Sequence, residues 1–272
     1  MARRKGDEFQ LVLTRYAIER FLYRLSRSKV RAHFVLKGAI LFTAWMDDPH
    51  RPTRDADLLG IGDNSVPALE KTFRGVCGVS VRDDGIAFLP DSVRAAVIRE
   101  DQTYEGVRIK LLGLLDGARI PVQVDVGFGD AVVPAPRALT LPKLLDFPAP
   151  RLKAYSPASV IAEKFETMVK LGIANSRMKD YYDIWVMIHQ FRLNKRTLGR
   201  AILKTCERRK TTLPTDLPVG LTVEFSNDAQ KQTQWRAFLD KGGLTRVPKS
   251  LDLVVRNVRD FLWPLLEKRG EV

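Results

Sequence analysis

The sequence predicts a mixed α/β (α+β) protein, with an N-terminal lobe on a mixed sheet over residues 1–150 and a C-terminal helical lobe over residues 151–272. Between residues 79 and 128 the hydrophobic pattern approaches a period of two, as in strands, whereas near the start and after residue 156 it is helical. Five prolines between residues 134 and 150 separate these patterns and indicate a link between the lobes. A chain of 272 residues, 45% apolar, can bury the cores that this organisation requires.

The first elements follow from local patterns. Apolar residues at helical spacing predict an amphipathic helix over residues 7–28. Residues 34–45 are mostly apolar and predict a short helix after a glycine-containing turn. A strand is expected to start near Asp55 and end before the loop at 60–64, and a further helix is expected over residues 66–76.

A β-hairpin is predicted next. The strand-like segments VRIKLLGLL and RIPVQVDVGF flank a turn at Asp116, Gly117 and Ala118. On the second strand Gln123 and Asp125 share one face. The other face carries the apolar residues Ile120, Val122, Val124 and Val126.

The C-terminal lobe reads as helices. Ser156 followed by Pro157 is a typical helix start, with a serine N-cap and a proline at the first helical position. Helices are expected over residues 157–172, 178–191, 195–209 and 250–266.

The composition of the chain limits the classes of function that it can have. The net charge of +13 favours a polyanionic partner such as nucleic acid, because basic side chains that neutralise phosphates release counterions; the alternative is that the charge only serves solubility. No apolar run reaches the roughly 18–20 residues that cross a bilayer. The N-terminus MARRKGDEFQ lacks a signal-peptide core, so a cytoplasmic protein without membrane partners is expected.

Thiolate and imidazole metal sites are not expected. The chain has two cysteines, Cys77 and Cys206, which are too few for a disulfide framework or a thiolate site. Its three histidines, His33, His50 and His189, have no ligand spacing.

Carboxylates form the strongest candidate site. Asp55 and Asp57 are two residues apart in a predicted strand, so both project to one side. Such close carboxylates repel unless a cation lies between them, and Mg²⁺ prefers oxygen ligands completed by substrate phosphates. Asp125 could converge on them from the hairpin strand, and three such acids suit a phosphoryl-transfer site with one or two metal ions. The alternatives are a charged surface turn for the pair and an exposed polar-face residue for Asp125.

Gly38 and Lys37 are candidates for the phosphate side of the same site. A glycine before a helix start lets backbone N–H groups approach a phosphate closely, and Lys37 could add charge. The alternatives are a helix-packing glycine and a solvated lysine.

Two charged residues fall on apolar helix faces of the C-terminal lobe. Lys164 lies within the apolar arc of residues 157–172, and Asp180 lies within that of the next helix, with Asp183 at its edge. A buried ammonium requires a partner or a ligand. Lys164 and Asp180 either pair between the two helices, or Lys164 binds a triphosphate while Asp180 orients it or acts as a base.

Five segments together resemble the AbiEii/AbiGii toxin family, DNA-polymerase-β-like nucleotidyltransferases that include the mycobacterial MenT toxins. The segments are FVLKGAILFTAW, RPTRDADLL, VQVDVGFGD, SVIAEKFETMVKLG and SRMKDYYDIW, in order between residues 34 and 185. The resemblance implies a polymerase-β-like nucleotidyltransferase lobe followed by a helical lobe. It also implies Mg²⁺ or Mn²⁺ as cofactor and an NTP as substrate.

The resemblance assigns roles to individual positions. It makes Asp55, Asp57 and Asp125 metal-binding and catalytic, and Lys164 and Asp180 the essential lysine and aspartate of the third and fourth motifs. The nucleotide-binding residues it implies, with Lys164, are Lys37, Gly38, Ala39, Arg51 and Thr53. Two positions depart from the pattern. Ala39 replaces the serine of the first motif, and Lys179 replaces the arginine that usually opens the fourth motif.

The resemblance also implies partners. Members of the family serve as toxins with a cognate antitoxin, protein or RNA, and some add nucleotides, often pyrimidines, to the 3′ end of tRNA and so block translation. A basic run over residues 192–210 is a candidate RNA surface, or alternatively a solvated helix face. Its proposed RNA-binding residues are Arg196, Arg200, Lys204 and Arg208.

Two other functions remain open at this point. One is transfer of a nucleotide or phosphate to a protein or a small molecule. The other is a catalytically degenerate RNA-binding module, which the alanine at position 39 makes worth considering.

Overall fold

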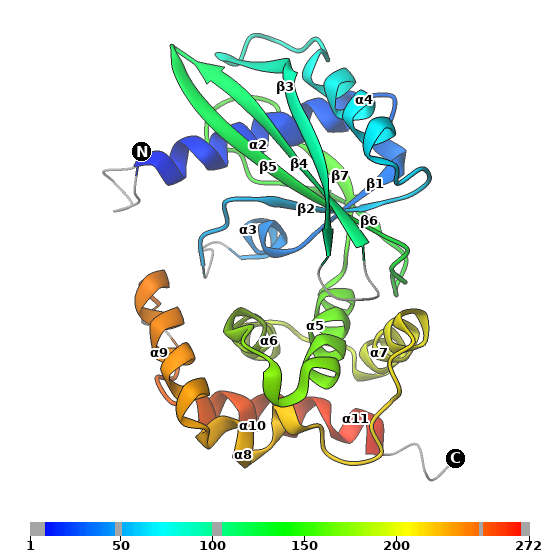
Figure 1. Ribbon diagram of the computed structural model, residues 1–272, viewed down its shortest axis with the longest axis vertical. Coiled ribbons are helices and arrows are strands. Elements are labelled where there is room, and N and C mark those ends of the chain that lie inside the picture. Colours follow the sequence, from blue (N-terminus) through cyan, green and yellow to red (C-terminus); the bar gives the residue numbers. More distant parts are fainter. Residues whose placement is uncertain (1–8, 47–50, 100–104, 245–246, 268–272) are drawn as a thin grey trace. The chain divides into compact units, whose positions relative to one another are not determined.

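The structure, a computed structural model, describes residues 9–46, 51–99, 105–244 and 247–267 (Figure 1). By their internal contacts the residues divide into two compact units. One comprises Met1–Gly129 and Pro136–Tyr155, the other Asp130–Ala135 and Ser156–Val272. The predicted lobe ranges, 1–150 and 151–272, stay a prediction.

The first unit is built on a seven-stranded mixed sheet with the order β3-β4-β5-β2-β1-β7-β6. Its strands are β1 (Phe34–Lys37), β2 (Ala56–Gly60), β3 (Ile86–Arg99), β4 (Glu105–Leu115), β5 (Ala118–Phe128), β6 (Arg137–Thr140) and β7 (Arg151–Ala154). Strand β2 is central, since it pairs antiparallel with β1 and parallel with β5. The mixed sheet of this unit and the helical second unit confirm the predicted fold class.

Two helices pack against one face of the sheet, α2 (Phe9–Arg27) and α4 (Val66–Cys77). In Figure 1, α2 runs beside β5, and α4 lies beside β3. The ring of Phe21 on α2 stacks on Phe73 of α4 at 5.8 Å and meets Phe88 of β3 edge-on at 5.3 Å. The core of this unit therefore lies between these helices and the sheet.

Residues 34–45 differ from the expected helix. Phe34–Lys37 form strand β1, and only after Gly38 do a 3₁₀ turn, η2 (Ala39–Leu41), and a short helix, α3 (Phe42–Trp45), begin. Since β1 lies inside the sheet between β2 and β7, its first three residues are buried on both faces and show no alternation. A uniformly apolar strand of this kind cannot be told from a helix by its period.

The hairpin prediction is confirmed. Leu115 of β4 pairs with Ala118 of β5 across Asp116 and Gly117. The φ angles of these two loop residues are +46° and +79°, as a two-residue turn that matches the strand twist requires. The four apolar residues that alternate along β5 are at most 1% exposed.

Two strands that the sequence pattern did not predict lie in the proline-rich stretch (β6) and directly after it (β7). Strands β6 and β7 pair antiparallel, and β7 adds parallel to β1. Each has only four residues, which is too short for the sequence pattern to identify it as a strand.

The second unit is helical, with α5 (Pro157–Leu171), α6 (Met178–Gln190), α7 (Lys195–Arg209), α8 (Val223–Asn227), α9 (Ala229–Gly242), α10 (Leu251–Leu262) and α11 (Pro264–Glu267). The helices predicted at 157–172, 178–191 and 195–209 are confirmed within a residue. The Ser156 hydroxyl accepts a hydrogen bond from the backbone N–H of Ser159, as an N-cap does. The helix predicted over 250–266 is divided into α10 and α11, and α8 and α9 were not predicted.

Short 3₁₀ turns, η1 (Arg31–His33), η3 (Gly172–Ala174) and η4 (Val219–Leu221), connect neighbouring elements. Among the helices described, none combines the length and the apolar character needed to cross a membrane.

Candidate functional site

Charged residues gather on one face of the first unit's sheet. The register aligns Asp57 of β2 with Asp125 of β5, and aligns Lys37 of β1 with Asp57. Directly paired residues project to the same side of a sheet. Their neighbours Ala56 and Val124 project to the other side, where the sheet packs on α2. The candidate site therefore lies on the face away from that helix.

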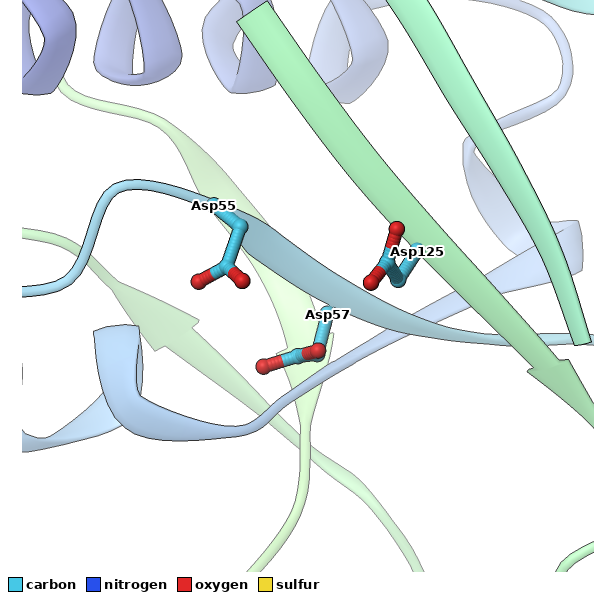
Figure 2. A group of neighbouring side chains, drawn as sticks. All are labelled: Asp55, Asp57 and Asp125. Carbon is cyan, nitrogen blue, oxygen red and sulfur yellow. The ribbon is translucent and has the colours of Figure 1, made fainter. Parts of the chain in front are cut away.

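Asp55, Asp57 and Asp125 converge on this face. One carboxylate oxygen of each lies within 4.8 Å of those of the other two. Figure 2 shows Asp55 at the entry of β2, Asp57 further along that strand and Asp125 on the adjacent β5. All three side chains are half-buried, so they remain accessible to solutes. We refer to these three residues as the acidic triad.

The segment that leads into β2 orients the first acid. The hydroxyl of Thr53 donates to Oδ1 of Asp55 at 2.8 Å, which fixes the carboxylate two residues ahead of it. Arg51 is half-buried at the start of the same segment, and Arg54 is exposed. Thr53, which the resemblance implied to be a nucleotide-binding residue, therefore supports a triad member directly.

Gly38 adjoins the triad. Its backbone has φ +75° and ψ −162°, a conformation that only glycine adopts without strain. A Cβ at this position would stand 1.9 Å from Oδ2 of Asp57, so the backbone of residue 38 and that carboxylate are in direct contact. This close approach, rather than helix packing, accounts for the glycine.

The neighbours of Gly38 complete this edge of the site. Lys37 ends β1, and its ammonium lies over the ring of Tyr155, 5.6 Å from the ring centre. Ala39 opens the turn η2 and is half-buried. No side-chain hydroxyl is therefore present at position 39, and the polar groups there belong to the backbone.

Arg108 is a site residue that sequence reasoning missed. It lies on β4 directly opposite Asp125. Its Nε donates to Oδ1 of Asp125 at 2.8 Å, and a terminal nitrogen donates to Oδ2 at 2.7 Å. The sequence contained enough information to find this pair. A two-residue turn fixes which residues of the two strands face each other, and Arg108 and Asp125 lie at equal distances from the turn on either side.

Lys164 and Asp180 pair in the second unit, as one of the two sequence interpretations expected. The Lys164 ammonium is 2.5 Å from Asp180 and 2.9 Å from Asp183. Both carboxylates are only 1% exposed, and the lysine is 14% exposed. Asp183, which the pattern put at the helix edge, is a full member of this cluster.

The guanidinium beside Asp180 belongs to Arg177, whose Nε donates to Oδ2 of Asp180 at 2.8 Å. Lys179, at the position where an arginine was expected, is exposed. Burial opposes the ionisation of Asp180, but the charges of Lys164 and Arg177 outweigh it and hold the pKa of that carboxyl below its usual value. Asp180 is therefore an anion near neutral pH, and a weak base.

The basic residues on α7 lie in two different environments. The four proposed RNA-binding residues, Arg196, Arg200, Lys204 and Arg208, are exposed, and Lys204 pairs with Glu207 at 2.6 Å. Arg209 instead turns inward to Glu166 of α5 at 2.9 Å and to Asp130 at 3.0 Å. Because both acids are almost fully buried, Arg209 belongs to the core of the second unit rather than to the basic surface.

The acidic triad has the ligand chemistry of a hard divalent cation. Three carboxylates on two adjacent strands supply oxygen ligands only, which favours Mg²⁺ or Mn²⁺ over metals that prefer nitrogen or sulfur. The backbone of Gly38 lies directly against the Asp57 carboxylate at the edge of this triad. These residues fit a metal-dependent phosphoryl-transfer site.

Comparison with known proteins agrees with this geometry. The sequence model of the family described as "Nucleotidyl transferase AbiEii toxin, Type IV TA system" matches residues 20–257. No curated protein matches the sequence.

Solved structures resemble this fold at low sequence identity. JHP933 from Helicobacter pylori superposes with a TM-score of 0.53 at 11% identity, over 97% of this chain and 95% of that chain. A candidate nucleotidyltransferase from H. pylori gives a TM-score of 0.47 at 10% identity, over 95% of this chain and 98% of that chain. At such identities the likeness to JHP933 concerns the fold alone.

Proposed function

Because this chain belongs to the AbiEii family of nucleotidyltransferase toxins of type IV toxin–antitoxin systems, we propose that it transfers a nucleoside monophosphate from an NTP to RNA. The acceptor we propose is the 3′ end of a tRNA, where an added nucleotide blocks aminoacylation and so translation. The observation that carries the proposal is the convergence of three carboxylates within 4.8 Å beside a backbone that only glycine can form.

The acidic triad would hold Mg²⁺ or Mn²⁺, which supplies charge neutralisation for the triphosphate and lowers the pKa of the attacking hydroxyl. The chain's own contribution is to hold the three carboxylates rigidly. Asp57 is fixed by β2 and Asp125 by β5, while Asp55, directly before β2, is held by the hydroxyl of Thr53. In the reaction the hydroxyl oxygen bonds to the α-phosphorus, and pyrophosphate leaves.

We assign the nucleotide phosphates to the backbone at Gly38 and Ala39, with Lys37 as a nearby positive charge. A free N–H at such a turn donates to a phosphate oxygen without any hydroxyl side chain. The loss of the serine hydroxyl at position 39 therefore reduces phosphate contacts without removing them. Arg51 and Thr53 are further proposed nucleotide-binding residues, and a pyrimidine NTP is the proposed substrate.

Lys164 is proposed to bind the triphosphate, with Asp180 as the residue that orients it. Two buried carboxylates, Asp180 and Asp183, pair with the ammonium and fix its position. Since the pKa of Asp180 is held below its usual value, we favour orientation over proton abstraction as its role.

RNA is proposed to bind through the exposed basic residues of α7, which supply positive charge at the surface. The family further implies a cognate antitoxin, protein or RNA, as the partner that controls the activity. We propose that the enzyme acts in the cytoplasm, where tRNA is found.

The test is an incorporation assay. Purified chain is mixed with total tRNA, Mg²⁺ and each α-labelled NTP separately, and the RNA and protein are resolved on a gel. We expect label in RNA with wild type and none with Asp57→Asn, which keeps the side-chain shape but removes a charge. Periodate-oxidised tRNA, which lacks a 3′ diol, should accept no label.

The outcomes separate the alternatives. Label on protein alone selects transfer to protein, and an absence of label with all four NTPs contradicts RNA transfer. If RNA still binds in a salt-sensitive manner while no NTP binds in the presence of Mg²⁺, the chain is a degenerate RNA-binding module.

A further inference from the structure

Arg108 and Asp125 form a close ion pair on the polar face of the sheet. Two nitrogens of the guanidinium donate to the two carboxylate oxygens at 2.8 and 2.7 Å, so the pair is bidentate. The Asp125 side chain is 13% exposed and that of Arg108 is 38% exposed. A positive charge therefore already engages both oxygens of one member of the acidic triad.

Strand geometry makes this pair a fixed part of the site. Arg108 and Asp125 are cross-strand partners on adjacent β4 and β5, and the hairpin turn sets that register. The amide of Gln123 also approaches Oδ2 of Asp125, at 3.4 Å. Asp55, by contrast, accepts from the neutral hydroxyl of Thr53. The site thus combines three carboxylates with one guanidinium aimed at the third.

We propose that Arg108 is an internal counter-cation of the metal site, which positions Asp125 and competes with a divalent ion for its charge. The inference rests on the proposed function, because it concerns the same three carboxylates. Arg108 offsets one of their three negative charges, and so it weakens metal binding in the absence of nucleotide. The triphosphate, with its own negative charge, then becomes necessary for tight metal binding, which couples metal binding to the substrate.

The test is a titration of the full chain with Mn²⁺ in the absence of nucleotide, with free Mn²⁺ followed by electron paramagnetic resonance. Arg108→Gln removes the charge, and we expect it to bind Mn²⁺ about threefold to tenfold more tightly than wild type, as expected for the loss of a partly buried bidentate charge. Arg108→Lys keeps the charge and should stay within about twofold of wild type.

Two controls isolate the pair. Lys110 is exposed on the same strand and face, opposite Gln123, so Lys110→Gln removes one nearby charge without touching Asp125. We expect its Mn²⁺ affinity to match wild type. In an Asp125→Asn background the effect of Arg108→Gln should vanish, since Arg108 acts through that carboxylate.

Unchanged or weaker Mn²⁺ binding by Arg108→Gln overturns the inference, as does an equal gain in Lys110→Gln or in the Asp125→Asn background. Asp57→Asn separates this failure from failure of the proposed function. If Asp57→Asn loses Mn²⁺ while Arg108→Gln behaves as wild type, the metal site stands and only the role of Arg108 is wrong. If wild type and Asp57→Asn bind Mn²⁺ equally, the acidic triad is no metal site, and both proposals fail.

Discussion

At Gly38 the backbone and a carboxylate occupy space that no side chain can share. We predict that Gly38→Ala abolishes nucleotide transfer and lowers the free energy of unfolding by about 1–3 kcal/mol, because φ is +75° and the new Cβ would meet Asp57 at 1.9 Å. Urea denaturation and the incorporation assay measure the two effects. Gly75→Ala, in helix α4 with nothing within 4 Å of its Cβ, is the control and should leave both unchanged or raise stability. Full activity in Gly38→Ala would contradict the assignment of this contact.

The Lys164 cluster has a consequence for pH. Because the pKa of Asp180 is lowered in the folded protein from 3.8, its contribution to stability is present above that pH and is lost as the pH falls through the lower, folded value. We predict that the stability of wild type declines more steeply below about pH 4 than that of Asp180→Asn. Urea denaturation of both proteins between pH 6 and pH 3 checks this; parallel declines would show that Asp180 has no depressed pKa.

Alternation along single strands was enough to predict that Asp55, Asp57 and Asp125 project from polar faces. It could not predict that β2 and β5 are parallel neighbours, because that pairing joins strands distant in sequence. Arg108 was missed for a different reason, since its partner follows from the hairpin register rather than from composition. The burial of Asp183 was underestimated, because a residue at the edge of a helix's apolar face can still be covered by another helix.

Among the elements, α7 has two faces that differ in environment, one exposed and one packed on buried acids. Arg209 neutralises Asp130 and Glu166, so we predict that Arg209→Met lowers the free energy of unfolding by about 3–5 kcal/mol, the cost of leaving buried carboxylates without their cation. The adjacent Arg208→Met, on the exposed face, should change it by less than about 0.5 kcal/mol. If the two substitutions change the free energy of unfolding equally in urea denaturation, Arg209 is not a core residue distinct from the exposed Arg208.

Element prediction succeeded where local signals are strong. The turn at Asp116 and Gly117 and the cap at Ser156 each have a specific backbone requirement that the residues meet. It failed at β1, whose burial on both faces removes the alternation that identifies strands. It also missed α9, although Asp228 caps it by accepting from the N–H of Lys231, because no proline or apolar period marks that start.

At the scale of the whole molecule, the net charge of +13 is expected to act through specific surfaces rather than uniformly. We predict that replacing Arg196, Arg200, Lys204 and Arg208 with glutamine reduces the slope of log affinity for tRNA against log salt by up to about 0.7 per lost contact. Fluorescence anisotropy at several salt concentrations measures this. A matched set of exposed residues, Arg236, Lys241, Lys249 and Arg256, is the control. An equal decrease of this slope in both sets of variants would mean that tRNA does not bind preferentially to α7.

The most direct measurement of the central claim is the intact mass of a single tRNA after incubation with the protein, Mg²⁺ and each unlabelled NTP in turn. The account predicts that wild type adds one or more nucleoside monophosphates to the RNA with at least one NTP, and that folded Asp57→Asn adds none. The size of the increment identifies the nucleotide. An unchanged RNA mass with all four NTPs, or an equal increment with Asp57→Asn, would contradict metal-dependent nucleotide transfer by the acidic triad.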